Sequence, residues 1–148
     1  MKSVIAVWNA GGKGKSNTLR ELARLLLTEY PNCRPIYPDP AVIPAKGDFR
    51  LLIEINKKII AIETKGDPGT NLEERLIDLA EIHHCDLIFC TCRTSGETKL
   101  AVKHLSAKCG HEIIWTSTYQ VADGDKHKLI NTLKAKHLLD LVKKLGLL

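Results

Sequence analysis

The chain has 148 residues, of which 44% are hydrophobic and 26% charged, and its net charge at pH 7 is +5. These values are ordinary for a soluble globular protein and predict one domain, residues 1–148, with a sizeable core. No apolar run in the sequence is long enough to cross a bilayer, so we expect no membrane partner for the chain. The five cysteines lack the spacing of a small disulfide framework, and no signal-peptide pattern opens the chain, so we expect a cytoplasmic location.

The basic net charge suits polyanionic ligands, which include nucleoside triphosphates and nucleic acids. The two tryptophans, three tyrosines and two phenylalanines indicate no obvious stacking surface for single-stranded nucleic acid. The lysines near the C-terminus are spread around a helical pattern rather than gathered in a stripe, which favours a solvated face. Nucleic acid therefore stays open as a partner, with little in the sequence to favour it.

The first informative stretch joins an apolar strand to a helix through glycines. Residues 4–8 predict a buried strand, and apolar residues at helical spacing predict a helix over 15–28. The residues around this junction include the glycines and lysines that an anion-binding loop requires. These candidate phosphate-binding residues are Gly11, Gly12, Lys13, Gly14, Lys15, Ser16 and Asn17.

The residue types in this loop match the chemistry of phosphate binding. Glycines let consecutive backbone N–H groups approach an anion closely, and the following helix adds the positive end of its dipole. Lys15 would reach the β- and γ-phosphates, and the Ser16 hydroxyl would bind the Mg²⁺ that accompanies a nucleoside triphosphate. The alternative is a glycine turn with coincidental lysines, but the flanking strand and helix supply the context that a phosphate-binding loop needs.

This loop resembles the Walker A motif of the P-loop NTPase superfamily, G-x-x-x-x-G-K-[ST], with Gly14, Lys15 and Ser16 matching. Asn9 stands where the first glycine of the motif would be. The loop also resembles the variant form found in partition and septum-site ATPases, but Ala10 replaces their signature lysine. The resemblance implies a nucleoside triphosphate and Mg²⁺ as ligands and places Lys15 among the catalytic residues.

A proline-rich segment follows the first helix. Residues 31–48 hold five of the six prolines and predict a loop rather than a strand or helix. A long loop in a small domain is usually functional, and we interpret this one as a lid, a switch or a surface for a protein partner. The helix before it should bury its apolar stripe and expose Arg20, Glu21 and Arg24.

Two strands, residues 49–55 and 59–63, follow as a hairpin. Glu63 ends the second strand, which we expect beside the strand that precedes the glycine loop, and a carboxylate there would hold Mg²⁺ or its water shell. The next residues resemble the D-x-x-G element of GTPase-like switch proteins, which implies a γ-phosphate contact from Gly66. Asp67 would orient or activate an attacking water. The alternative is a strand end followed by a polar turn.

The second half of the chain alternates helices and strands. Its patterns predict helices over 71–84, 96–107 and 126–145, and strands over 86–92 and 112–116. Arg93 directly follows a strand that looks central and parallel, at the edge where open α/β sheets bind ligands. It would either stabilise transferring charge or be a solvated surface residue.

The cysteines and histidines between residues 83 and 111 include enough ligands for zinc but match no standard zinc module. Cys90 and Cys92 lie in an apolar strand, which favours small core residues over metal ligands or nucleophiles. Whether any of these residues binds a metal stays open.

The element order predicts a three-layer α/β sandwich with a mostly parallel five-stranded sheet and one antiparallel edge strand. This order looks like the P-loop NTPase fold, closer to its GTPase-like and partition-ATPase half. The N-K-x-D motif that reads guanine is missing, since Asn56-Lys57 lies in the hairpin turn without the aspartate, so ATP is favoured over GTP. We therefore expect Mg²⁺-dependent ATP binding and hydrolysis. The alternatives are a small kinase and a slow nucleotide-dependent switch.

Overall fold

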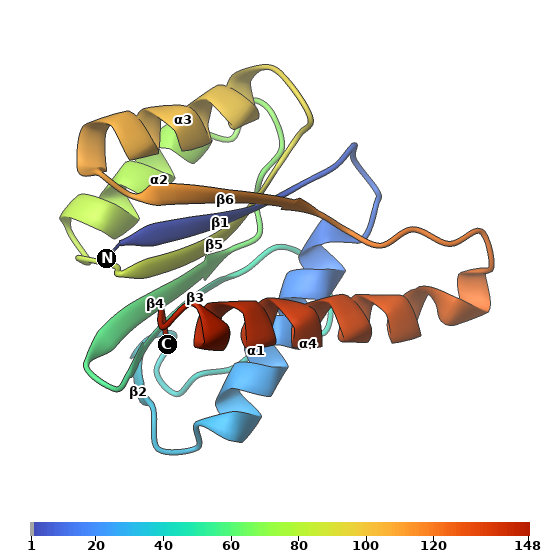
Figure 1. Ribbon diagram of the computed structural model, residues 1–148, viewed down its shortest axis with the longest axis horizontal. Helices are drawn as coiled ribbons and strands as arrows, with labels where there is room; N and C mark the ends of the chain where they lie inside the picture. The colour runs from blue at the N-terminus through green and yellow to red at the C-terminus, as the bar shows by residue number, and fades with distance from the viewer. Residues whose placement is uncertain (1) are drawn as a thin grey trace.

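The computed structural model describes residues 2–148 as one sheet with helices on both faces (Figure 1). In chain order the elements are β1 (Ser3–Trp8), α1 (Lys15–Glu29), β2 (Arg34–Tyr37), β3 (Arg50–Ile55), β4 (Lys58–Glu63), α2 (Leu72–Glu81), β5 (Leu87–Cys92), α3 (Glu97–Cys109), β6 (Glu112–Ser117), the short 3₁₀ helix η1 (Gly124–Lys126) and α4 (His127–Lys144). The predicted α/β class is confirmed.

In the described part of the chain the sheet has six strands, in the order β2-β3-β4-β5-β1-β6. β4, β5, β1 and β6 run parallel, whereas β3 is antiparallel to β4 and β2 is antiparallel to β3. The expected five-stranded sheet with one antiparallel edge strand is therefore wrong in two respects. There is an additional strand, β2, and it displaces the antiparallel strand β3 from the edge.

The additional strand lies inside the segment 31–48, for which the sequence predicted a loop. Pro35 in β2 pairs with Ile53 of β3, and among residues 2–148 no strand lies on the other side of β2. A proline has no N–H to give to a sheet, but at an edge the missing donor leaves no neighbouring carbonyl unpaired. The proline-rich composition therefore led to the prediction of a loop, because a strand that contains proline is possible here only at the edge of the sheet.

The strand that ends at Glu63 is not beside β1, because β5 lies between β4 and β1. The expected adjacency was wrong for a physical reason. Every residue of β5 is buried, so its apolar pattern marks a central strand without saying which strands flank it. The consequence is that β5, not β4, approaches the glycine loop directly.

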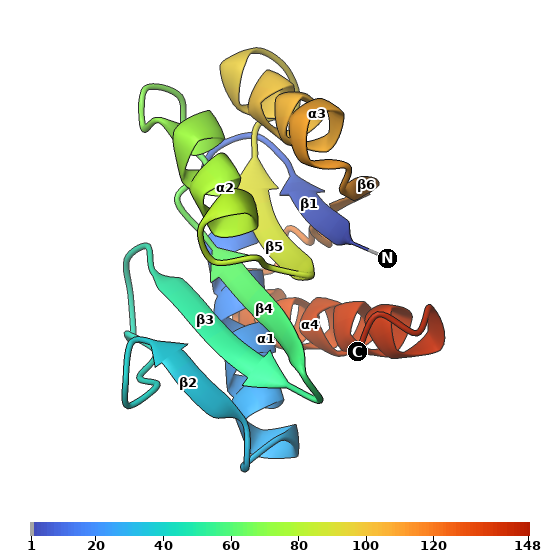
Figure 2. The ribbon, with the colours of Figure 1, turned by 90° about the vertical axis from the view of Figure 1, so that its left-hand side faces the viewer.

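Helices cover the sheet in pairs, α1 with α4 on one face and α2 with α3 on the other (Figures 1 and 2). Alternate residues of β1 serve the two cores: Ile5 and Val7 pack toward α1 and α4, and Val4 and Ala6 toward α2 and α3. The carboxyl ends of the four parallel strands share one edge of the sheet. The loops that leave this edge form the site described below.

Arg20 of α1 is buried, with only 4% of its surface exposed, although the sequence predicted it in solvent. Its guanidinium donates hydrogen bonds to the backbone carbonyls of Pro44 and Gly47, and it lies 5.7 Å from the centroid of the Phe49 ring. These contacts compensate for burial of the charge. Arg20 thus holds the end of the proline-rich segment against α1 and fixes the entry into β3.

Candidate functional site

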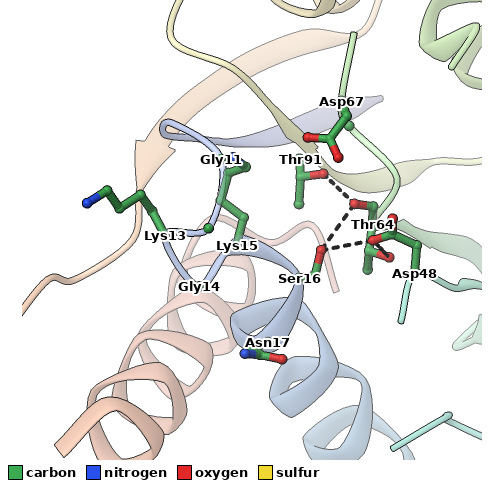
Figure 3. A pocket seen from close by; sticks show the side chains of 12 residues that line it. Gly11, Lys13, Gly14, Lys15, Ser16, Asn17, Asp48, Thr64, Asp67 and Thr91 are labelled. Atoms are coloured by element: carbon green, nitrogen blue, oxygen red, sulfur yellow. Dashed lines mark hydrogen bonds between the residues drawn. The ribbon is translucent and has the colours of Figure 1, made fainter. Parts of the chain in front are cut away.

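A cavity of about 230 Å³ opens at the carboxyl edge of the parallel strands (Figure 3). Its lining combines the glycine loop and the start of α1 with residues from three later segments. The lining residues are Gly11, Gly12, Lys13, Gly14, Lys15, Ser16, Asn17, Asp48, Thr64, Gly66, Asp67 and Thr91. All of the predicted phosphate-binding residues therefore lie together around one cavity.

The glycine loop is braced from the segment that follows β6. Thr118 and Gln120 both donate hydrogen bonds to the carbonyl of Lys13, at 2.8 and 2.7 Å. The Asn9 side chain donates to the Thr118 hydroxyl and accepts from the Ala10 N–H. The asparagine that replaces the first glycine of the motif is thus a structural anchor. Sequence reasoning missed this brace, because Thr118 is 109 positions from Asn9.

The Lys15 side chain is 7% exposed and lies against the loop rather than in solvent. Its amine donates 2.8 Å hydrogen bonds to the carbonyls of Asn9 and Ala10. Burial lowers the pKa of this amine, and the positive charge of Arg93 lowers it further, while Asp67 acts in the opposite direction. No carboxylate forms an ion pair with it in residues 2–148, so a polyanion entering the cavity would supply the missing counter-charge.

Ser16 begins an oxygen-rich cluster at one side of the cavity (Figure 3). Its hydroxyl donates to Asp48 Oδ1 at 3.0 Å, and the Thr64 hydroxyl donates to the same oxygen at 3.1 Å. The Thr64 carbonyl accepts a hydrogen bond from the Thr91 hydroxyl at 2.6 Å. A carboxylate, hydroxyls and a carbonyl are the hard oxygen donors that suit Mg²⁺. Asp48 is the acidic residue of this cluster, and the sequence analysis did not identify it as a candidate metal ligand.

Glu63, the predicted metal ligand, does not line the cavity. Its carboxylate is 5% exposed and pairs with Arg50 at 2.6 Å and Arg75 at 2.7 Å. Both carboxylate oxygens are therefore engaged with guanidinium groups, which neutralise the buried charge. Glu63 is therefore not part of the oxygen cluster at the cavity, and its ion pairs hold the end of β4 to β3 and α2.

Gly66, the predicted γ-phosphate contact, is pressed against β5. A Cβ built on it would lie 2.0 Å from the backbone oxygen of Thr91, so no larger residue fits without displacing the backbone. This close packing brings the next residue, Asp67, to the cavity wall. The 64–67 segment is thus positioned by β5.

Arg93 and Asp67, predicted as catalytic residues from separate segments, are in contact. The guanidinium donates to Asp67 Oδ1 at 3.0 Å, and a Cβ on Gly11 would lie 2.8 Å from the same nitrogen, Nη2. Arg93 therefore lies directly against the glycine loop. By contrast, Lys13 is exposed and extends away from the oxygen cluster (Figure 3), and the Asn17 side chain accepts a hydrogen bond from Arg20.

Comparison of the chain with protein-family models, with curated proteins and with solved structures finds no match. Within residues 2–148, no three histidine, cysteine, aspartate or glutamate side chains are grouped closely enough to hold a metal ion by themselves. The helices described here are also too short or too polar to cross a bilayer. The geometry of the cavity is therefore the basis for assigning a function.

Proposed function

We propose that this chain binds a Mg²⁺–nucleoside triphosphate, preferably ATP, in the cavity around the glycine loop and hydrolyses its γ-phosphate, as a P-loop NTPase does. The observation that carries the proposal is the buried Lys15 amine, which lies at the cavity wall and whose hydrogen-bond acceptors within residues 2–148 are two backbone carbonyls. An unneutralised ammonium beside a glycine loop and a helix N-terminus favours a polyanion. Neither an ordinary turn nor a solvated lysine accounts for this arrangement.

The phosphates would lie over residues 11–16. Backbone N–H groups of the loop would donate to phosphate oxygens, and the N-terminus of α1 would add its partial positive charge. Lys15 would exchange its carbonyl contacts for the β- and γ-phosphate oxygens. The braces from Thr118 and Gln120 keep the loop in shape before the nucleotide arrives, which reduces the entropic cost of binding.

The metal would lie beside Ser16, where the residues fit it. The Ser16 hydroxyl and the Asp48 carboxylate would hold the metal directly or through a bound water, and the triphosphate with further water would supply the remaining oxygen ligands. Such a site needs only one or two carboxylates, in keeping with the absence of a larger acidic cluster in the described chain. Bound Mg²⁺ would neutralise charge on the β- and γ-phosphate oxygens.

Asp67 and Arg93 would assist the transfer itself. In hydrolysis the oxygen of a water attacks the γ-phosphorus, the bond to the β-phosphate oxygen breaks, and the water gives up a proton. Asp67 would orient this water and accept its proton, and Arg93 would stabilise the charge on the transferring group. Asp67 lines the cavity and Arg93 does not, but their 3.0 Å contact holds Arg93 beside the cavity wall before substrate binds.

We favour ATP over GTP because the one Asn-Lys pair that resembles a guanine-reading motif lies far from the cavity. Asn56 and Lys57 form the turn between β3 and β4, at the opposite edge of the sheet from the cavity. They are therefore too remote to contact a base whose phosphates lie over the loop.

Calorimetric titration of ATP and GTP with Mg²⁺ into wild type, Lys15→Ala and Lys136→Ala tests the proposal, followed by phosphate release on the same samples. Lys15→Ala should weaken triphosphate binding by roughly 10-fold to 150-fold, the equivalent of one charge-assisted hydrogen bond or more. Lys136→Ala removes an exposed lysine of α4 and should bind like wild type.

The remaining outcomes choose among the classes of function. Phosphate release without an acceptor supports an ATPase, and release only with an added acceptor supports a kinase. Tight binding with almost no release supports a nucleotide-dependent switch. Unchanged binding in Lys15→Ala would refute the assignment of the loop.

A further inference from the structure

A second surface feature lies on the α2 and α3 face of the sheet, apart from the phosphate cavity. Trp8 at the end of β1 and Trp115 in β6 are 37% and 36% exposed. Ala6 pairs with Trp115 and Trp8 with Ser117, so the two indoles are diagonal neighbours on the same face of adjacent strands. Together with Thr94, Lys99 and Lys103 they line a depression of about 340 Å³. We call these five residues the tryptophan patch.

The patch is positively charged. Lys99 and Lys103 are four residues apart on α3, so their side chains emerge one helical turn from each other. The Lys99 amine lies 5.7 Å from the centroid of the Trp115 ring, a distance compatible with a cation–π contact. None of the five lining residues carries a negative charge. Two aromatic faces thus stand next to two cations without a competing carboxylate among the lining residues.

We propose that the tryptophan patch binds single-stranded nucleic acid, with bases stacked on Trp8 and Trp115 and backbone phosphates on Lys99 and Lys103. Stacking on an aromatic side chain accepts any base, because every base has a π-face, and a row of cations follows the backbone. The net charge of +5 favours a polyanion over the protein as a whole. Composition alone indicated no stacking surface. The pairing of β1 with β6 creates one from the only two tryptophans of the chain.

A single strand of nucleic acid fits this surface better than a free mononucleotide does. The patch is an open depression with two separate indoles, and a single nucleotide would use one indole and one phosphate contact. Successive nucleotides of one oligonucleotide would contact both indoles and both lysines at once. Because these contacts are linked, the overall affinity exceeds that of a single nucleotide, which makes the same kinds of contact. An acidic peptide would pair with the lysines but would leave the two exposed indole faces without a specific partner.

The two tryptophans make the test direct, because both belong to the patch, so tryptophan fluorescence excited selectively over the three tyrosines reports only on it. The probe is an oligothymidylate of about 16 nucleotides, long enough to cover a typical single-strand site. It should quench the tryptophan fluorescence saturably, and a fluorescein-labelled copy should gain anisotropy over the same concentration range. Binding should weaken between about 50 and 200 mM salt, because release of counterions from the oligonucleotide is less favourable at higher salt.

Variants assign the binding to the patch. Trp115→Ala should weaken binding by roughly 5-fold to 150-fold, the range for loss of one stacked base, and Trp115→Phe should restore part of it. The double change Lys99→Ala with Lys103→Ala should reduce the slope of log affinity against log salt by about 1.4. The matched control, Lys136→Ala with Lys144→Ala, removes two exposed lysines from α4 on the opposite face and should leave affinity within about 2-fold.

Three results would overturn the proposal. One is the absence of saturable binding by a folded wild type. Another is equal quenching by thymidine monophosphate at the same concentration, which would assign the patch to a free nucleotide. The last is an equal loss of affinity in the α4 control, which would mean attraction to net charge alone. Because the measurements contain no triphosphate and read out the two tryptophans of the patch, failure of the ATPase proposal leaves this one intact.

Discussion

The hydroxyl of Ser16 donates a 3.0 Å hydrogen bond to the carboxylate of Asp48, a residue 32 positions away in the chain. The contact exists because β3 runs antiparallel to β4, so the start of β3 lies at the carboxyl edge of the parallel strands. Arg20 then holds the residues before β3 against α1. The direction of one strand thus brings a carboxylate to the serine of the glycine loop.

Asp48→Asn should reduce the Mg²⁺ dependence of ATP binding. The substitution keeps the side-chain shape but removes the negative charge that we assign to the metal or its water shell. We expect the gain in ATP affinity on adding Mg²⁺ to fall by about 10-fold to 100-fold, as for comparable metal-positioning groups. Calorimetric titrations with Mg²⁺ and with a chelator measure this gain.

Glu63→Gln is the matched comparison for Asp48→Asn. It leaves the guanidinium groups of Arg50 and Arg75 without their anion in a largely buried position. The free energy of unfolding should therefore fall by about 1–3 kcal/mol, while the effect of Mg²⁺ on ATP binding stays near the wild-type value. If Glu63→Gln abolished the effect of Mg²⁺ and Asp48→Asn did not, the assignment of the metal side of the cavity would be wrong.

Gly66→Ala should destabilise the protein and disturb the cavity. Its new Cβ would lie 2.0 Å from the Thr91 backbone oxygen, so the 64–67 segment or β5 must move. Overpacking of this kind typically costs about 1–3 kcal/mol in the free energy of unfolding. Urea denaturation measures the cost. Phosphate release should slow, because Asp67 moves with its neighbour. Gly124→Ala, which has open space around its Cβ, should unfold like wild type.

The affinity for triphosphate should fall as pH rises through the Lys15 pKa of the free protein. Burial and Arg93 lower this pKa below the ordinary value of 10.5, and a bound polyanion would raise it again. Between the two values the amine must gain a proton on binding, so affinity decreases by up to about tenfold per pH unit. Binding curves in alkaline buffers measure this slope. Lys15→Arg should show little of it, because arginine stays charged, whereas an identical slope in both proteins would argue against Lys15.

Arg20→Ala should loosen the proline-rich segment from α1. The variant loses the hydrogen bonds from the guanidinium to the carbonyls of Pro44 and Gly47, which we expect to lower the free energy of unfolding by about 2–3 kcal/mol. Trypsin should also cleave the folded Arg20→Ala variant after Lys46 faster than it cleaves the wild type. Arg24→Ala removes an exposed helix arginine that pairs with Glu21 and should change stability by less than about 0.5 kcal/mol. Equal protease sensitivity in the two variants would count against this role of Arg20.

The local parts of the site could be predicted because they lie in one short stretch. A strand, glycines, Lys15, Ser16 and a helix follow each other within residues 3–29, so backbone geometry and helix direction place them without long-range information. The apolar periods also predicted every element of the α/β order except β2 and the short η1. These are properties of neighbouring residues, and the sequence by itself determined them.

The tertiary structure decided which distant residues meet this stretch. An apolar period says that a strand is buried, but not which strands flank it, so β5 rather than β4 lies beside β1. In this strand order Glu63 forms ion pairs with two arginines instead of facing the glycine loop. The antiparallel direction of β3 brings Asp48 to Ser16. The pairing of β1 with β6 likewise joined Trp8 to Trp115. Strand order and direction depend on how the helices cover both faces of the whole sheet, and no single segment encodes that.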